Sequence, residues 1–166
     1  MTRLAALLLC TAALSGCGLR PLYAGGAAGP VAQVLRSVTV QPIAGQTGWL
    51  VRTALVDRLG EPQGSAARYR LEVELDDDIE GYGIRGDAAV TRERRTLRAR
   101  YRLVDLANGA VVLDATAGSD AGIDVVSSEY ATVAAEQTAA ERLSQIVADQ
   151  IVARLGLFAN RTGAQP

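Results

Sequence analysis

The sequence contains no histidine, and because all seventeen of its basic residues are arginine it contains no lysine either. A Ser-His-Asp or Cys-His nucleophile requires an imidazole base, while Schiff-base chemistry and the phosphate-binding P-loop require lysine. Zinc sites usually draw on histidine and cysteine, and only two cysteines are present. These absences exclude much catalytic chemistry, and they predict a protein that is not an enzyme and that holds neither a metal nor a cofactor.

Aromatic residues and prolines are also few: one tryptophan, one phenylalanine, five tyrosines and five prolines in 166 residues. This length and the hydrophobic fraction of 49% suit one globular domain with a substantial core. The formal net charge of -1 gives no electrostatic argument for nucleic acid, so we expect no nucleic-acid partner.

The first seventeen residues have the pattern of a bacterial lipoprotein signal. Arg3 gives a positive start, and the apolar stretch 4–14 would rise about 16 Å as a helix, against a hydrocarbon core of about 30 Å. The Leu-Ser-Gly-Cys motif at 14–17 then matches the lipobox, although an ordinary signal peptide with a chance cysteine is the alternative. We therefore predict cleavage after residue 16 and lipidation of Cys17 as an N-palmitoyl, S-diacylglycerol cysteine.

Lipidation has consequences for the rest of the chain. Cys10 would leave with the signal and Cys17 would carry acyl chains, so we predict no intramolecular disulfide. Gly18 follows the cysteine in place of the aspartate that holds many lipoproteins at the inner membrane, which favours an outer-membrane, periplasm-facing anchor. The expected divisions are a signal peptide at 1–16, a lipid-anchored flexible tether at 17–30, a single domain at 31–156 and a disordered tail at 157–166.

Hydrophobic periodicity predicts the order strand, helix, three strands, long helix. The expected elements are a strand at 37–40, a helix at 49–59 with Thr47 as its N-cap, strands near 69–76, 97–103 and 110–117, and a helix of roughly 26 residues that ends at Gly156. Two amphipathic helices would then cover one face of a four-stranded, mostly antiparallel (mixed) sheet, an α+β fold. The other sheet face would be polar and free to meet a partner, and Trp49 is expected in the core or between helix and sheet.

The Asn-Gly turn at 108–109 can be assigned from hydrophobic matching. A two-residue hairpin would place inward Leu103 opposite Asp114 and bury a charge. A three-residue loop at 107–109, with its glycine in the left-handed conformation, instead pairs Leu103 with Leu113. The sequence therefore favours the longer, bulged turn.

Arginines are concentrated on the second long strand, where all but Arg95 share one strand face. The six are Arg92, Arg94, Arg95, Arg98, Arg100 and Arg102. The shared face would form a cationic stripe about 33 Å long, and the planar guanidinium fork suits the phosphates of a glycolipid. Alternatively, a turn near 85–86 would set Glu72 opposite Arg100, and cross-strand ion pairs would then account for most of the stripe.

Arg92 and Arg95 have no assigned partner in that pairing, so they are the candidate ligand-binding residues. The acidic run at 76–78 with Glu80 lacks the ligand spacing of a calcium loop and is interpreted as a solvated strand end. Paired carboxylates also occur in glycosidases, but no aromatic platform for a sugar accompanies these.

The residues at 17–23, Cys-Gly-Leu-Arg-Pro-Leu-Tyr, closely resemble the C-G-[FL]-x-P-L-Y opening of the lipopolysaccharide-assembly lipoprotein family LptE, particularly its alphaproteobacterial branch. The stretch 128–155, which begins Ser-Glu-Tyr-Ala-Thr, resembles that family's final helix. The expected strand order and the length agree with the family as well.

The resemblance implies a non-catalytic role in the outer membrane. LptE proteins plug the outer-membrane β-barrel LptD, help it to assemble and assist lipopolysaccharide transport to the cell surface. The implied partners are therefore LptD, lipopolysaccharide and the membrane that holds the anchor, with Cys17 as the one site residue carried over and Arg92 and Arg95 as candidate lipopolysaccharide contacts. The alternative is a periplasmic lipid- or solute-binding lipoprotein that serves an inner-membrane transporter, which an apolar cavity between helices and sheet would support.

Overall fold

The computed structural model describes residues 29–60, 62, 67–84, 90–126 and 128–163. Its elements are α2 (Pro30–Arg36), β1 (Val38–Val40), α3 (Gly45–Leu59), β2 (Tyr69–Ile84), β3 (Val90–Asp105), β4 (Val111–Asp124) and α4 (Glu129–Gly163). The expected signal peptide, Cys17 and nearly all of the tether lie outside the described residues. Among the described residues, no helix has both the length and the apolar character needed to cross a membrane.

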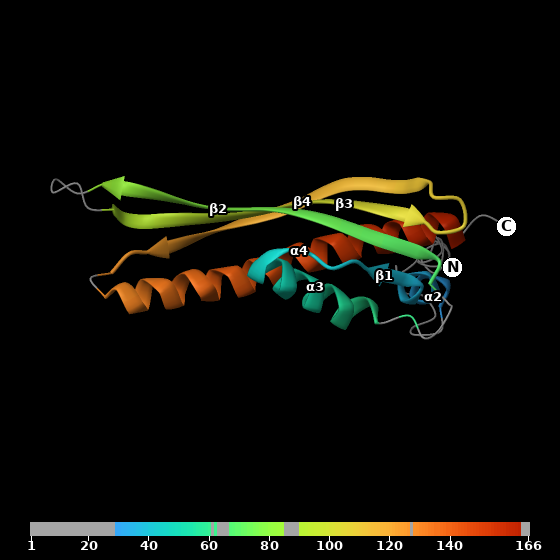
Figure 1. Cartoon of the computed structure of the whole chain (residues 1–166), viewed down its shortest axis with the longest axis horizontal. Helices are drawn as coiled ribbons and strands as arrows, with labels where there is room; N and C mark the ends of the chain where they lie inside the picture. The colour runs from blue at the N-terminus through green and yellow to red at the C-terminus, as the bar shows by residue number, and fades with distance from the viewer. Residues whose placement is uncertain (1–28, 61, 63–66, 85–89, 127, 164–166) are drawn as a thin grey trace, which may run out of the picture.

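The strands form one four-stranded sheet in the order β1-β2-β3-β4, with β1 parallel to β2 and the other pairs antiparallel. The sheet makes one layer, and the helices lie together on one side of it (Figure 1). The α+β prediction is confirmed. The helix count differs, because Pro30 begins the short helix α2 instead of ending a tether, and its fixed φ suits the first turn of a helix.

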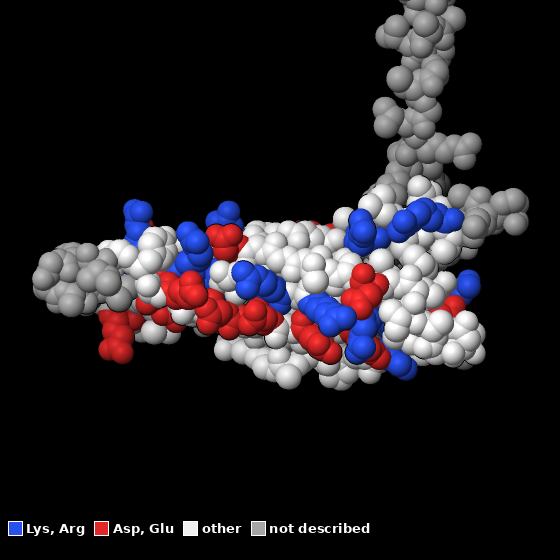
Figure 2. Space-filling model, turned by 90° about the horizontal axis from the view of Figure 1, so that it is seen from above, with Lys and Arg blue, Asp and Glu red and all other residues white. Residues whose placement is uncertain are grey.

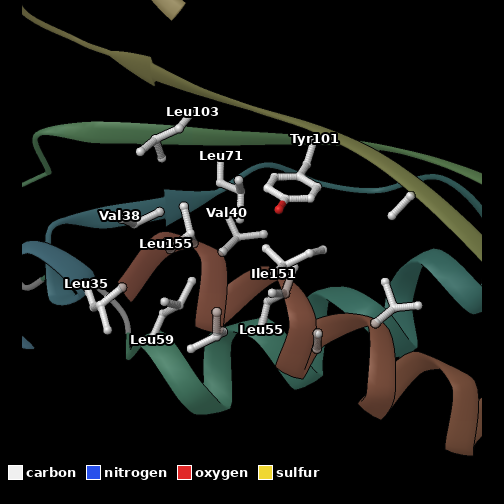
Figure 3. Packing of buried hydrophobic residues seen from close by; sticks show 14 of the residues in the cluster. Leu35, Val38, Val40, Leu55, Leu59, Leu71, Tyr101, Leu103, Ile151 and Leu155 are labelled. Carbon is white, nitrogen blue, oxygen red and sulfur yellow. The ribbon is translucent and has the colours of Figure 1, made fainter. Parts of the chain in front are cut away.

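The core lies between the inner face of the sheet, which is the face turned toward the helices, and the apolar sides of α3 and α4. Side chains from the sheet and from both helices meet there, as Figure 3 shows for Leu71, Tyr101, Leu55, Ile151 and Leu155. All five are at most 2% exposed. The alternation predicted for β2 and β3 is therefore confirmed, and so is the inward stripe of the last helix.

Three predictions about the helices are wrong, each for a local reason. Thr47 is not an N-cap, because α3 begins two residues earlier and the Thr47 hydroxyl donates to Asp77 across the sheet interface. Trp49 is not in the core: it is 62% exposed on the outer side of α3. The final helix does not end at Gly156 but runs to Gly163, so the expected tail is helical through that residue.

Packing explains the extension of α4. Phe158 and Ala159 are buried and continue the inward stripe after Leu155. The Phe158 ring meets Tyr69 edge to face, with 5.8 Å between ring centroids. A glycine inside a helix costs about 1 kcal/mol, and burial of a phenylalanine contributes more than that, so the helix passes through Gly156.

The β3–β4 hairpin has the predicted register. Leu103 pairs with Leu113, and Gly109 is left-handed with a φ of 72°. The loop itself is one residue longer than expected, because the Asp105 N–H donates to the Ala110 carbonyl at 2.9 Å. A register shift next to Leu103 absorbs the extra residue and restores the inward pairing.

The β2–β3 register differs from the prediction by two residues. Glu72 pairs with Arg102 instead of Arg100, while the faces of the strands stay as predicted. Because a shift of two residues keeps every side chain on its own face, hydrophobic patterning alone could not distinguish the two registers.

Candidate functional site: the outer face of the sheet

The candidate site is the outer face of the sheet, which is the face of β2, β3 and β4 turned away from the helices. Cross-strand pairing places acidic side chains of β2 and β4 on either side of the β3 arginines. The central rows are Glu72–Arg102–Asp114, Glu74–Arg100–Thr116, Asp76–Arg98–Gly118 and Asp78–Thr96–Asp120. Figure 2 shows that acidic and basic side chains are interspersed over much of the length of this face.

All five arginines of the stripe have a carboxylate partner. Arg102 lies 3.2 Å from Glu72, Arg100 lies 3.0 Å from Asp114, Arg98 lies 3.8 Å from Asp76, Arg94 lies 3.9 Å from Asp120 and Arg92 lies 3.2 Å from Asp124. The cross-strand interpretation of the stripe is therefore confirmed, with partners from both neighbouring strands. The outer face is a ladder of paired charges and not a bare cationic surface.

The pair between Arg100 and Asp114 has the best geometry on this face. Two guanidinium nitrogens of Arg100 reach the two oxygens of Asp114, at 3.4 and 3.0 Å. Hydrogen bonding to Arg100 lowers the pKa of Asp114, and the carboxylate in turn raises the pKa of Arg100. Both groups are in solvent, so the pair orients charge on the surface and adds little to stability.

A shallow hollow of about 730 Å³ crosses the middle of the ladder. Gly118 lies at its β4 side, where the central row has no third side chain. Its walls present the guanidinium groups of Arg98 and Arg100 and the hydroxyl of Thr116. Such a surface can exchange its own ion pairs and hydrogen bonds for those of another polar surface.

Arg95 lies on the opposite face from the stripe, at the interface between sheet and helices. Its guanidinium binds Asp77 through Nε at 2.8 Å and Nη2 at 2.6 Å. It also donates to the Glu136 carbonyl of α4 at 2.9 Å and to the Thr47 hydroxyl of α3 at 3.2 Å. Thr47 completes the cluster by donating to Asp77 at 2.6 Å. We call Arg95, Asp77, Thr47 and the Glu136 carbonyl the inner clasp, because they join two strands and two helices.

The inner clasp shifts the pKa values of both of its ionisable side chains, Asp77 and Arg95. Hydrogen bonds from Arg95 lower the pKa of Asp77 against the opposing effect of burial, and the Thr47 hydroxyl and the Arg95 charge add to the lowering. The same carboxylate raises the pKa of Arg95. Both groups therefore stay charged wherever the protein is folded near neutral pH.

The prediction that Arg92 and Arg95 lack partners is wrong. Arg92 pairs with Asp124 and Arg95 with Asp77, so neither arginine lacks a partner. Strand parity could have found the second pair, since Asp77 and Arg95 both fall on the inward face of their strands. The acidic run divides accordingly: Asp76 and Asp78 face outward and Asp77 inward. No cluster of potential metal ligands occurs within the part of the chain that the structure describes.

Among the described residues, side chains fill the apolar part of the space between the helices and the sheet, and the one hollow there, of about 150 Å³ beside the inner clasp, is lined mostly by polar residues. Leu143, Val147 and Ile151 on α4 are fully buried against Leu71 and Leu97 of the sheet. This packing removes the observation that would have favoured a periplasmic lipid- or solute-binding protein.

Solved structures share this architecture. A lipoprotein from Caulobacter crescentus CB15 is 29% identical with a TM-score of 0.63, and the match covers 78% of this chain and 96% of that one. Rare lipoprotein B from Shewanella oneidensis is 9% identical with a TM-score of 0.60, covering 76% and 98%. Lipoprotein B from Nitrosomonas europaea is 12% identical with a TM-score of 0.56, covering 74% and 82%. No curated protein matches the sequence.

The fold and its charge-paired sheet define a small two-layer α+β domain of the kind found in these bacterial lipoproteins. The family model of LptE, described as lipopolysaccharide-assembly, matches residues 35–155. The chain therefore belongs to the LptE family, and the resemblance identified from its sequence is confirmed.

Proposed function

We propose that this protein is an outer-membrane lipoprotein, anchored through Cys17, that fills the lumen of the LptD β-barrel and assists lipopolysaccharide transport without catalysis. Family membership supports the general role in lipopolysaccharide assembly. The observation that supports the specific role is the outer face, because a plug must offer satisfied polar groups to a polar lumen wall. Six arginine–carboxylate contacts, made by the five arginines of the stripe with side chains of β2 and β4, give the outer face a surface of this kind.

The main test is recovery of the barrel from solubilised outer membranes by a tagged copy of this chain. We expect the unmodified chain to recover a large β-barrel protein in an amount equal to its own. Arg98→Glu with Arg100→Glu reverses the charge of two side chains at the hollow. The new glutamates would lie beside the carboxylates of β2 and β4, and the resulting excess of negative charge should reduce recovery of the barrel several-fold.

A matched control makes the same charge change on the helical layer. Arg142 and Arg161 are exposed on α4, and Arg142→Glu with Arg161→Glu should recover as much barrel as the unmodified chain. Equal recovery by the outer-face variant would refute contact through this face. Unchanged barrel levels, lipopolysaccharide export and detergent resistance after deletion of the gene would refute the whole proposal.

Direct binding of lipopolysaccharide by Arg92 and Arg95 stays a prediction. Arg92 pairs at the surface, with its side chain 62% exposed, so a phosphate can compete with Asp124 for its guanidinium. Arg92→Ser should weaken binding of purified lipopolysaccharide without lowering stability. Arg95→Ser requires a parallel measurement of unfolding, because all three nitrogens of its guanidinium are used within the inner clasp.

A further inference from the structure

β4 forms one edge of the sheet, so within the part of the chain that the structure describes one side of its backbone has no neighbouring strand. Just after β4, the Val125 N–H donates to the Thr91 carbonyl at 3.0 Å, which shows that Val125 faces β3. Gly118 instead directs both its N–H and its carbonyl away from β3. Because bonding alternates along an antiparallel strand, the even-numbered residues face the open side. These are Asp114, Thr116, Gly118, Asp120, Gly122 and Asp124.

Gln150 of α4 occupies the middle of this open edge. The Gly118 N–H donates to Gln150 Oε1 at 3.0 Å, and Gln150 Nε2 donates to the Gly118 carbonyl at 3.2 Å. A side-chain amide offers one acceptor and donors beside it, as a peptide group does. Gln150 thus makes the two bonds that a residue of a fifth strand would make. Among the described residues, it is the one side chain that bonds to the outward backbone groups of β4.

The rest of the edge near Gly118 is accessible, since the even-numbered residues of β4 from 114 to 124 are exposed. The hollow described above reaches both Gly118 and Gln150, so another chain can approach there. The residues from Ala115 to Gly122 are all small apart from Asp120. An uncovered edge with small side chains is a template for pairing with another strand.

The charges along β4 are compatible with an antiparallel pairing of two copies of the chain that is centred on Gly118. With Gly118 opposite Gly118 in an antiparallel pair, Thr116 lies opposite Asp120 and Asp114 lies opposite Gly122. No acidic side chain then faces another directly. Moving the centre of the pairing by one residue to either side places Asp114 opposite Asp120 or opposite Asp124, and like charges in that arrangement destabilise a sheet. The favoured register is centred where the Gln150 amide sits.

We propose that Gln150 closes this edge against a second copy of the chain, and that removing its amide lets two copies pair through β4 about Gly118. The inference does not depend on the barrel proposal, since it concerns the isolated chain. Gln150 lies on the surface of α4, so its truncation leaves the core intact.

The first test is self-association measured by sedimentation velocity over a hundredfold range of concentration. The unmodified chain should remain monomeric, whereas Gln150→Ala should shift to dimers as concentration rises. Gln137→Ala is the control, because the Gln137 amide contacts Glu141 on its own helix and should leave the chain monomeric. A monomeric Gln150→Ala at every concentration would overturn the proposal, and so would equal dimerisation of the Gln137→Ala control.

The second test fixes the register by disulfide trapping in the Gln150→Ala background, with Cys10 and Cys17 replaced by serine. Thr116→Cys with Asp120→Cys places thiols opposite each other across the dimer, about 5.5 Å apart at the Cα atoms, so covalent dimers should form under mild oxidation. Thr116→Cys alone should give none, because the two copies of that residue are offset by about 13 Å along the strands. Equal trapping by both variants, or none by the double variant, would refute the register.

Discussion

Asp76 and Asp77 are adjacent in the sequence, yet the ion pairs that they make belong to different environments. Asp76 lies 3.8 Å from Arg98 on the outer face, where the two side chains are 72% and 71% exposed. Asp77 lies 2.6 Å from Arg95 in the inner clasp, where the side chains are 21% and 13% exposed. The difference shows that one step along a strand changes a solvent-screened contact into a link between layers.

The two regions therefore have different tasks. The outer pairs are easily exchanged, because water and salt compete for their members. The inner clasp has five hydrogen bonds in a partly desolvated setting, and leaving one partner there without the other is costly. We expect the outer face to determine what the domain binds. We expect the inner clasp to determine how firmly α3 and α4 are held against β2 and β3.

The largest effect that separates the two regions should come from Arg95→Ala. Its removal leaves the Asp77 carboxylate without its partner, so the free energy of unfolding should fall by about 2–4 kcal/mol. Arg98→Ala is the matched control and should change it by less than about 0.5 kcal/mol. Equilibrium unfolding in urea measures both, and equal losses would contradict the contrast between the two faces.

The pH dependence of stability should follow Asp77. Because its folded pKa is lowered, its stabilising contribution is complete above the ordinary aspartate pKa and is lost as the pH falls through the lowered value. Asp77→Asn should cost about 1–2 kcal/mol at neutral pH and should flatten the acid side of the stability curve. Asp76→Asn should leave the acid side unchanged, and unfolding at a series of pH values distinguishes the two. A curve for Asp77→Asn that parallels the unmodified protein would argue against the assignment.

Thr47→Ala should have a smaller effect, about 1 kcal/mol, because it removes one hydroxyl that both donates to Asp77 and accepts from Arg95. Thr47→Ser keeps the hydroxyl and should recover most of the loss in a thermal unfolding experiment. If serine and alanine were equally destabilising, the methyl group and not the hydroxyl would be the important part of the side chain.

The smallest effect is expected for Trp49→Ala, within about 0.5 kcal/mol, because the side chain is 62% exposed on α3. Leu55→Ala, six residues further along α3, removes a fully buried side chain and should cost about 2–5 kcal/mol. A large loss for Trp49→Ala in the same urea titration would mean that the tryptophan packs against something after all.

Periodicity predicted much of this fold because residues 97–103 of β3 alternate between buried and outward-facing side chains. Leu97, Ala99, Tyr101 and Leu103 are buried as expected, and the β3–β4 register follows from matching them to β4. The β2–β3 register could not be obtained in this way, because a two-residue shift preserves every face. The prediction that Trp49 lies in the core is wrong because the apolar character of a side chain does not show which side of the helix it occupies.

The candidate site was predicted in outline and misassigned in detail. Strand parity put five arginines on one face, and the structure confirms that face and its acidic partners. The predicted strand pairing assigns Arg95 no partner, whereas in the structure its partners come from β2, α3 and α4. Contacts between elements far apart in the sequence depend on how layers pack, which periodicity within one strand does not specify.

The length of α4 sets a limit on how the domain can be seated. Its 35 residues extend about 52 Å, which matches the roughly 53 Å of the 16-residue strands β2 and β3. The hydrocarbon layer of a bilayer is only about 30 Å thick. If the domain lies along the axis of a barrel, as we propose, it extends about 20 Å beyond that layer, and one of its ends stands clear of the bilayer where soluble components can reach it.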